Sequence, residues 1–160
     1  MTASELPPEV AQLPDSSALA EFDPEAIVGG KLDRGELALL IQPERIVPVC
    51  EFLKISRRYL YLADITAVDW YPAEPRFEIV YHIYSHEHKQ RLRLKAKIGG
   101  ENPSIASVTS VWKSANWYER ETFDLFGVQF THHPNLKRIL MPEDWEGHPL
   151  RKDYPVTGYR

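Results

Sequence analysis

The chain has 160 residues, of which 43% are hydrophobic and 26% are charged, and its formal net charge is −4. This composition is ordinary for a globular protein and is sufficient for one domain with a substantial core. A single cysteine excludes a disulfide framework and an iron–sulfur cluster held by this chain alone. The charge balance lacks the strongly basic character expected of a nucleic-acid-binding protein.

The charges are unevenly distributed along the chain. Residues 1–44 carry nine acids and two bases, whereas residues 45–160 carry 14 acids and 17 bases. This asymmetry fits either weak steering toward acidic protein neighbours or a scattered, solvated surface. We interpret residues 1–24, which include four prolines, as an acidic leader with at most one loose helical turn. The sequence shows neither a signal peptide nor an apolar run of the roughly 18 residues that a membrane span needs, so we expect the reducing cytoplasm.

Residues 25–128 are predicted to form one α+β domain. Strands are expected at 26–29 and 36–41 with a turn between them, and a helix follows from Pro43. A long strand at 59–70 precedes two alternating strands at 76–84 and 89–98, which residues 85–88 join as a hairpin. A short helix is predicted at 105–112. This order favours a two-layer sandwich: one mixed sheet with helices on one face.

A charged helix is predicted at residues 117–126. Asn116 and Glu119 have the spacing of a capping box, and Gly127 stands where a left-handed C-terminal cap is wanted. Charged and aromatic residues are spread around the whole helix, so it has no continuous apolar stripe. We therefore expect it to bury at least one charge, with Arg120 and Asp124 as a local ion pair at i,i+4.

Residues 129–160 are predicted to be an extended, irregular C-terminal segment, called the arm below. Prolines at 134, 142, 149 and 155 exclude a long helix or a central strand, yet the segment is too apolar for a free tail. It either lies on another protein's surface or wraps its own domain. Trp145, Tyr154 and the arginines Arg138 and Arg151 are residue types typical of interface anchors.

Other candidate sites are weaker. Two sets of histidines could be metal ligands: His82, His86 and His88, and His132, His133 and His148. The other interpretation is that they are solvent-exposed residues on turns. The carboxylates Glu119, Glu121 and Asp124 are better suited to an ion-pair network than to acid–base catalysis, because no nucleophile accompanies them. The alternating basic strand with Arg91, Arg93, Lys95 and Lys97 indicates either a half-buried sheet edge or a phosphate or lipid-headgroup surface.

Three motifs resemble one known family. They are ERETFDLFG at 119–127, HPNLKRIL at 133–140 and EDWEGHPLRKDYP at 143–155, with weaker support from DITAVD at 64–69 and SVTSVW at 107–112. Their spacing is similar to that of the C subunit of the proton-pumping NADH:quinone oxidoreductase, respiratory complex I, whose photosynthetic relative is called the J subunit.

The resemblance implies a cofactor-free subunit without catalytic residues that positions the quinone-reducing module from the cytoplasmic side of the inner membrane. FMN, iron–sulfur clusters and quinone are then expected in partner subunits, chiefly those resembling the D and B subunits. Two alternatives remain: a subunit of a related membrane-bound hydrogenase or formate-oxidising complex, and a free-standing metal-dependent hydrolase. The residues predicted to contact partners are Glu119, Arg120, Asp124, Arg138, Trp145, Arg151, Asp153 and Tyr154.

Overall fold

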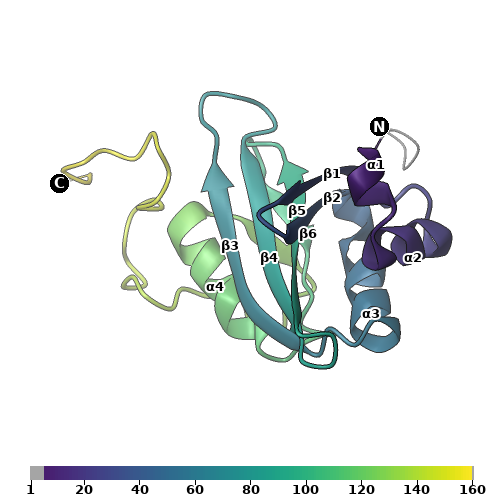
Figure 1. Cartoon of the computed structure of the whole chain (residues 1–160). Coiled ribbons are helices and arrows are strands. Elements are labelled where there is room, and N and C mark those ends of the chain that lie inside the picture. Colours follow the sequence, from purple (N-terminus) through teal and green to yellow (C-terminus); the bar gives the residue numbers. More distant parts are fainter. Residues whose placement is uncertain (1–5, 160) are drawn as a thin grey trace.

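A computed structural model describes residues 6–159 of the chain (Figure 1). The first five residues of the predicted leader and the last residue of the arm lie outside the described part. The main sheet has five strands: β1 Ile27–Asp33, β2 Glu36–Ile41, β3 Tyr61–Asp69, β4 Phe77–Ser85 and β5 Gln90–Ile98. Their spatial order is β1-β2-β5-β4-β3, with β2 and β5 parallel and the other neighbours antiparallel. The predicted mixed sheet is confirmed.

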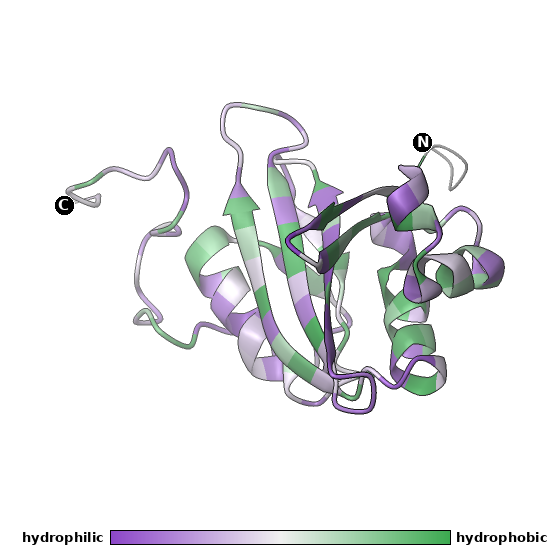
Figure 2. Ribbon diagram, in the orientation of Figure 1, coloured by the Kyte–Doolittle hydropathy of each residue, from purple (hydrophilic) through white to green (hydrophobic). Residues whose placement is uncertain are grey.

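The sheet has one covered and one open face. Helices α3 Ile46–Ser56 and α4 Ala115–Phe126 lie against the same face (Figure 1). Alternate strand residues point into this layer, and the alternation of apolar and polar residues is visible along β4 and β5 (Figure 2). The buried side of β5 consists of Leu92, Leu94, Ala96 and Ile98, as the period of two predicts.

Strand β5 lies in the middle of the sheet, so interpreting its basic side as a sheet edge is wrong. Because β2 and β4 flank it, its cations face neighbouring acids across the open face. Lys95 Nζ lies 2.7 Å from Glu78 Oε1, and Arg93 Nη2 lies 3.1 Å from Glu36 Oε2. The sequence shows the alternation of β5 but carries no local signal of its neighbours.

The helix predicted at 105–112 is also absent from the described chain. Residues Ser104–Ala106 form strand β6, which pairs in parallel with β7 Gln129–Thr131 in a small second sheet. The following turn is fixed by Trp112, whose indole Nε1–H donates to the Tyr59 carbonyl oxygen at 3.2 Å. The pairing partner of β6 is the beginning of the arm, so the first residues of the arm belong to regular structure.

The leader is more ordered than predicted. Helices α1 Pro8–Ala11 and α2 Pro14–Phe22 replace the single loose turn, and they pack on the body of the domain through Val10 and Leu19, both fully buried. Asp15 anchors α2, because its carboxylate accepts hydrogen bonds from Arg57 Nε at 2.8 Å and Tyr59 Oη at 2.6 Å. A long-range buried anchor of this kind leaves no pattern in the leader sequence itself.

We predict that Asp15→Ala destabilises the isolated chain by about 3 kcal/mol, because it leaves Tyr59 and Arg57 without their shared acceptor. Urea unfolding followed by circular dichroism measures the change. Asp33→Ala is the matched control: its partner Lys31 is exposed, so the midpoint of unfolding stays unchanged. Equal effects of the two substitutions would contradict the role of Asp15 as an anchor.

Candidate functional site

Helix α4 ends as predicted but begins differently. Gly127 follows it in the left-handed conformation, with φ of 76°. A side chain there would also collide with the arm, since an added Cβ would lie 2.5 Å from atoms of Arg151 and His148. At the other end, Ser114 is the N-cap and no side chain caps the helix, so the predicted capping box of Asn116 and Glu119 is wrong.

Glu119 is held in the interior by the loop that precedes α4. Its carboxylate is fully buried and accepts hydrogen bonds from Ser107 Oγ at 2.6 Å and the Val108 N–H at 2.7 Å. His133 Nε2 lies 3.9 Å from it, and this nitrogen carries a proton because it contacts the Asn116 carbonyl oxygen at 3.2 Å. Burial raises the pKa of Glu119 to about 7, against the lowering effect of these two hydrogen bonds. The expectation that α4 buries a charge is confirmed by Asp124, which is also fully buried and has a lowered pKa.

Asp124 is the centre of a network that joins α4 to the arm. Its carboxylate is fully buried and contacts Arg138 Nη1 at 2.6 Å through Oδ1. Its other oxygen accepts three consecutive backbone N–H groups, from Ile139, Leu140 and Met141, at 2.8–3.0 Å. The predicted local pair of Arg120 and Asp124 is wrong, because Arg120 donates to arm carbonyl groups at 137 and 138.

The arm also caps the C-terminus of α4. The last carbonyl groups of a helix have no partners within the helix and carry partial negative charge. Here Arg138 Nη1 and His148 Nδ1 donate to the Asp124 carbonyl oxygen at 3.1 and 2.8 Å, and the Leu150 N–H donates to the Leu125 carbonyl oxygen at 3.0 Å. Arg151 Nε donates to the Phe126 carbonyl oxygen at 2.6 Å. The donors therefore come from a segment that is remote in sequence.

A second network holds the arm against the loop between β3 and β4. Arg76 contacts Asp69 through Nε and Nη2 at 2.9 and 2.8 Å, and it contacts Asp153 through Nη1 and Nη2 at 3.0 and 2.6 Å. The Lys152 N–H donates to Asp69 Oδ2 at 2.9 Å. One arginine thus bridges two carboxylates, one from the domain and one from the arm.

These hydrogen bonds keep both buried aspartates charged. Burial alone would raise the pKa of Asp69, but bonds from Arg76 and from the N–H groups of Lys152 and Tyr71 lower it to about 2. Burial likewise opposes the shift of Asp124, whose pKa is lowered by the N–H groups of the arm and by Arg138. The contacts of Asp69 and Asp124 with the arm therefore contribute their full stability above the ordinary aspartate pKa. This contribution is lost as pH falls toward the lowered pKa values.

Most residues predicted to contact partners are engaged within the chain. Glu119 and Asp124 have no exposed surface, whereas Arg120, Arg138, Arg151 and Asp153 hold the arm to the domain. Contact of the eight predicted residues with a partner stays a prediction. Local sequence patterns gave no sign of Asp69 and Arg76, because their partners lie far along the chain, and they suggested His148 only as a possible metal ligand. The resemblance at 64–69 and 143–155 included Asp69 and His148.

The arm leaves apolar side chains in solvent even though its backbone is fastened. Leu140 and Leu150 are 60% and 51% exposed, and Tyr159 is 60% exposed. Trp145 Nε1 is buried and has no hydrogen-bond partner among the described residues. Figure 1 shows the arm extending away from the sheet beyond α4, and Figure 2 shows apolar stretches along it. The arm is therefore attached to its own domain through polar contacts, while several of its apolar side chains face outward.

The histidines are dispersed over the domain and the arm. His82 and His86 lie on the open face of the sheet. His133 and His148, both in the arm, contact backbone carbonyl groups of α4. Within residues 6–159, no group of three or more histidine, cysteine or acidic side chains is arranged to hold a metal ion.

Comparison with known proteins identifies the family. The model of the family described as "Respiratory-chain NADH dehydrogenase, 30 Kd subunit" matches residues 39–160. The chain belongs to this 30 kDa subunit family. It is therefore a subunit of complex I, and its partners are other subunits of that complex.

Relatives of known name agree with this assignment. The C subunit of the NADH-quinone oxidoreductase of Roseiflexus castenholzii is 51% identical over 135 residues, covering 83% of this chain and 78% of the relative. The C subunit of the same enzyme of Geobacter sulfurreducens is 54% identical over 126 residues, covering 78% of each chain.

Two solved structures share the fold of this 30 kDa subunit. A trypsin-resistant fragment of Nqo5 superposes with a TM-score of 0.66 at 29% identity, covering 75% of this chain and 97% of the fragment. A chain of the membrane-bound sulfane sulfur reductase, an archaeal respiratory membrane complex, gives 0.72 at 27% identity, covering 88% of this chain and 83% of that one. Among residues 6–159 of the 30 kDa subunit, we find no helix with the length and apolar character to cross a membrane.

We predict a specific pH dependence of stability from Glu119. Its pKa is about 7 in the folded chain against an ordinary 4.5, so between these values the folded protein keeps a proton that the unfolded chain has released. Stability therefore falls as pH rises through this window. Relative to wild type, Glu119→Gln should gain about 2 kcal/mol between pH 5 and pH 8. Denaturant unfolding at both pH values tests this, with exposed Glu121→Gln as the control that leaves the slope unchanged.

We further predict that Arg138→Ala releases the arm while the domain stays folded. The substitution removes one Asp124 partner and the donor to the carbonyl groups of Trp145 and Gly147, whereas backbone N–H groups still stabilise Asp124. Limited trypsin digestion should cut the arm of the variant at least about tenfold faster, which corresponds to a loss of roughly 1.4 kcal/mol of local stability. Lys137→Ala, one residue away, should digest like wild type; equal rates in both variants would contradict this role of Arg138.

Proposed function

We propose that this chain is a cofactor-free structural subunit of a proton-translocating NADH:quinone oxidoreductase, and that it has no catalytic residues of its own. It positions the quinone-reducing module by docking beside the subunits that resemble the B and D subunits. It acts at the cytoplasmic side of the inner membrane and is attached to the membrane only through the complex.

The observation that carries this proposal is the combination of a rigidly fastened arm with outward-facing apolar side chains. Two carboxylate networks, around Asp124 and Asp69, fix the path of the arm. A segment that is ordered before it binds loses less conformational entropy on docking, so its apolar contacts contribute more to affinity. Leu140, Leu150 and Tyr159 supply the apolar surface, and Trp145 adds an indole donor that has no partner among the described residues.

The titratable groups of the chain support a structural role. Glu119, Asp124 and Asp69 are each occupied by two or more hydrogen-bond donors from the chain itself. Catalytic acids and bases need a reacting proton within reach, whereas these three carboxylates are turned toward protein donors. FMN, iron–sulfur clusters and quinone therefore belong to partner subunits in this proposal, in keeping with the single, buried cysteine, Cys50.

One alternative has structural support, namely that the chain is a subunit of a related membrane-bound complex such as a hydrogenase. The likeness to a chain of the sulfane sulfur reductase complex shows that the fold also occurs in another respiratory membrane complex. The relatives at about 50% identity are subunits of NADH-quinone oxidoreductases, which favours the complex I assignment. Affinity purification of the chain followed by mass spectrometry separates the two: a nickel–iron large subunit among the co-purifying proteins would favour the alternative.

We predict that Arg138→Ala and Trp145→Ala each lower the amount of assembled complex and the quinone reductase activity in the same proportion. Loss of Arg138 leaves Asp124 with its backbone donors only and removes the donor to the Trp145 and Gly147 carbonyl groups, so the arm is held less firmly for docking. Blue-native electrophoresis and NADH:quinone activity in membranes measure the two quantities. Lys137→Ala is the control and should retain both.

Assembly of the complex and its turnover can be measured separately in these variants. If either variant assembled to the wild-type level but lost turnover, the residue would take part in the reaction and the structural role would be wrong. Leu150→Asp adds an independent test: it introduces a charge at an exposed apolar position, so the isolated chain should fold normally and fail to join the complex.

A further inference from the structure

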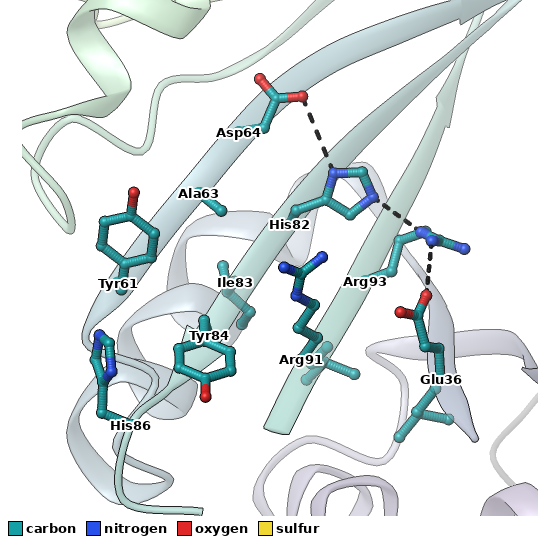
Figure 3. A pocket seen from close by; sticks show the side chains of 12 residues that line it. Glu36, Tyr61, Ala63, Asp64, His82, Ile83, Tyr84, His86, Arg91 and Arg93 are labelled. Carbon is teal, nitrogen blue, oxygen red and sulfur yellow. Dashed lines mark hydrogen bonds and ion pairs between the residues drawn. The ribbon is translucent and has the colours of Figure 1, made fainter. Parts of the chain in front are cut away.

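The open face of the main sheet contains a hollow that the arm does not use. Its volume is about 820 Å³, and it lies over strands β2 to β5 at the end where β3 begins and β4 ends (Figure 3). Polar and aromatic side chains line it in two rows that cross the strands. One row consists of Asp64, His82, Arg93 and Glu36, and the other consists of Tyr61, Tyr84 and Arg91.

The cation of the first row is engaged within the row. Arg93 Nε donates to His82 Nε2 at 2.9 Å, and Arg93 Nη2 contacts Glu36 at 3.1 Å. Because Nε2 accepts a hydrogen bond, the proton of the neutral imidazole is on Nδ1, which lies 4.0 Å from Asp64 Oδ2 (Figure 3). Burial and then the charge of Arg93 lower the pKa of His82, which keeps the ring neutral. Within this row, Arg93 is thus engaged by His82 and Glu36, whereas the half-exposed Asp64 faces a neutral imidazole.

The second row is open. Among residues 6–159, no hydrogen bond or ion pair engages the side chain of Arg91, which is exposed beside Tyr84 on the neighbouring strand. Tyr61 is 52% exposed, and His86 packs edge-on against Tyr84 with ring centroids 4.8 Å apart. Tyrosine and arginine are the residue types that contribute most to protein–protein binding, and here they lie together on a rigid sheet.

We propose that this hollow is a second docking surface, which binds a segment of a neighbouring subunit by pairing Arg91 with a carboxylate and packing an apolar or aromatic side chain on Tyr61 and Tyr84. The charge pattern selects this occupant. A phosphate group needs several free donors, whereas His82 and Arg93 are already engaged and leave Arg91 as the available cation of the two rows. A single guanidinium beside exposed rings suits one acidic side chain of a polypeptide.

This surface deepens the proposed function and rests on it, since the neighbour is a subunit of the same complex. It is physically separate from the arm: the hollow lies on the open face of the sheet, whereas α4 lies on the opposite face and the arm extends from it (Figure 1). The complex would therefore hold this subunit at two places. Loss of one contact leaves the other in place, so the two proposals can be tested independently.

The test is photo-crosslinking in the assembled complex. A benzoylphenylalanine is introduced in place of Tyr61, or of Ala63 in the same hollow, and the illuminated complex is digested and analysed by mass spectrometry. We expect crosslinks to a peptide of a neighbouring subunit with an aspartate or glutamate close to the linked residue. Adding Arg91→Glu should reduce the crosslink yield about tenfold. Lys97→Glu, the same charge reversal on the same face of β5, should leave the yield unchanged.

Three results would overturn the proposal: a yield at both positions no higher than in the dark, a yield insensitive to Arg91→Glu, or crosslinks to lipid or to a second copy of this chain. Co-purification of the Arg91→Glu chain with the complex distinguishes the two proposals. If the variant still assembles through the arm while the crosslink is absent in wild type, only the second docking surface is wrong. If the wild-type chain does not co-purify with complex I subunits, the proposed function fails as well.

Discussion

The last carbonyl groups of α4 determine where the arm lies. A helix that ends inside a protein must find donors for its last carbonyl oxygens, and here Arg138, His148, Leu150 and Arg151 provide them. Two of these donors are arginines, so positive charge lies at the negative end of the helix dipole. Because all four donors lie in the arm, completing the helix and fixing the arm are the same event. This coupling explains how the part of the arm after β7, which has no regular secondary structure, keeps a defined path.

The polar and apolar parts of the arm have separate tasks. Its donors and carboxylates face inward, toward Asp124, Asp69 and Arg76, while leucines at 140 and 150 remain in solvent. A self-contained domain arranges these groups the other way round, with apolar residues inside. The reversal is reasonable for a member of a multi-subunit family, because polar contacts can order the arm before assembly and the apolar surface is then available for a neighbour.

Periodicity and turn chemistry predicted the fold well from the sequence. The five strands of the main sheet, α3 and the left-handed cap at Gly127 follow from local patterns that a single stretch of chain contains. The failures have one cause in common. Strand β6 was predicted as a helix, Arg120 was paired with Asp124, and the leader was predicted to be loose, because the deciding partners lie far away in sequence. Asp15 with Tyr59 and Asp69 with Lys152 are examples at separations of 44 and 83 residues.

The order in which α4 and its cap are made has a consequence for biosynthesis. Because synthesis proceeds from the N-terminus, α4 leaves the ribosome before residues 138–151 do, so for that interval the end of the helix and the Asp124 carboxylate lack their donors. Domains fold as they emerge, and here the last step must wait until the arm has followed. A nascent chain, or one terminated before Arg138, would display an unfinished helix end, which distinguishes it from a finished subunit before any other subunit is met.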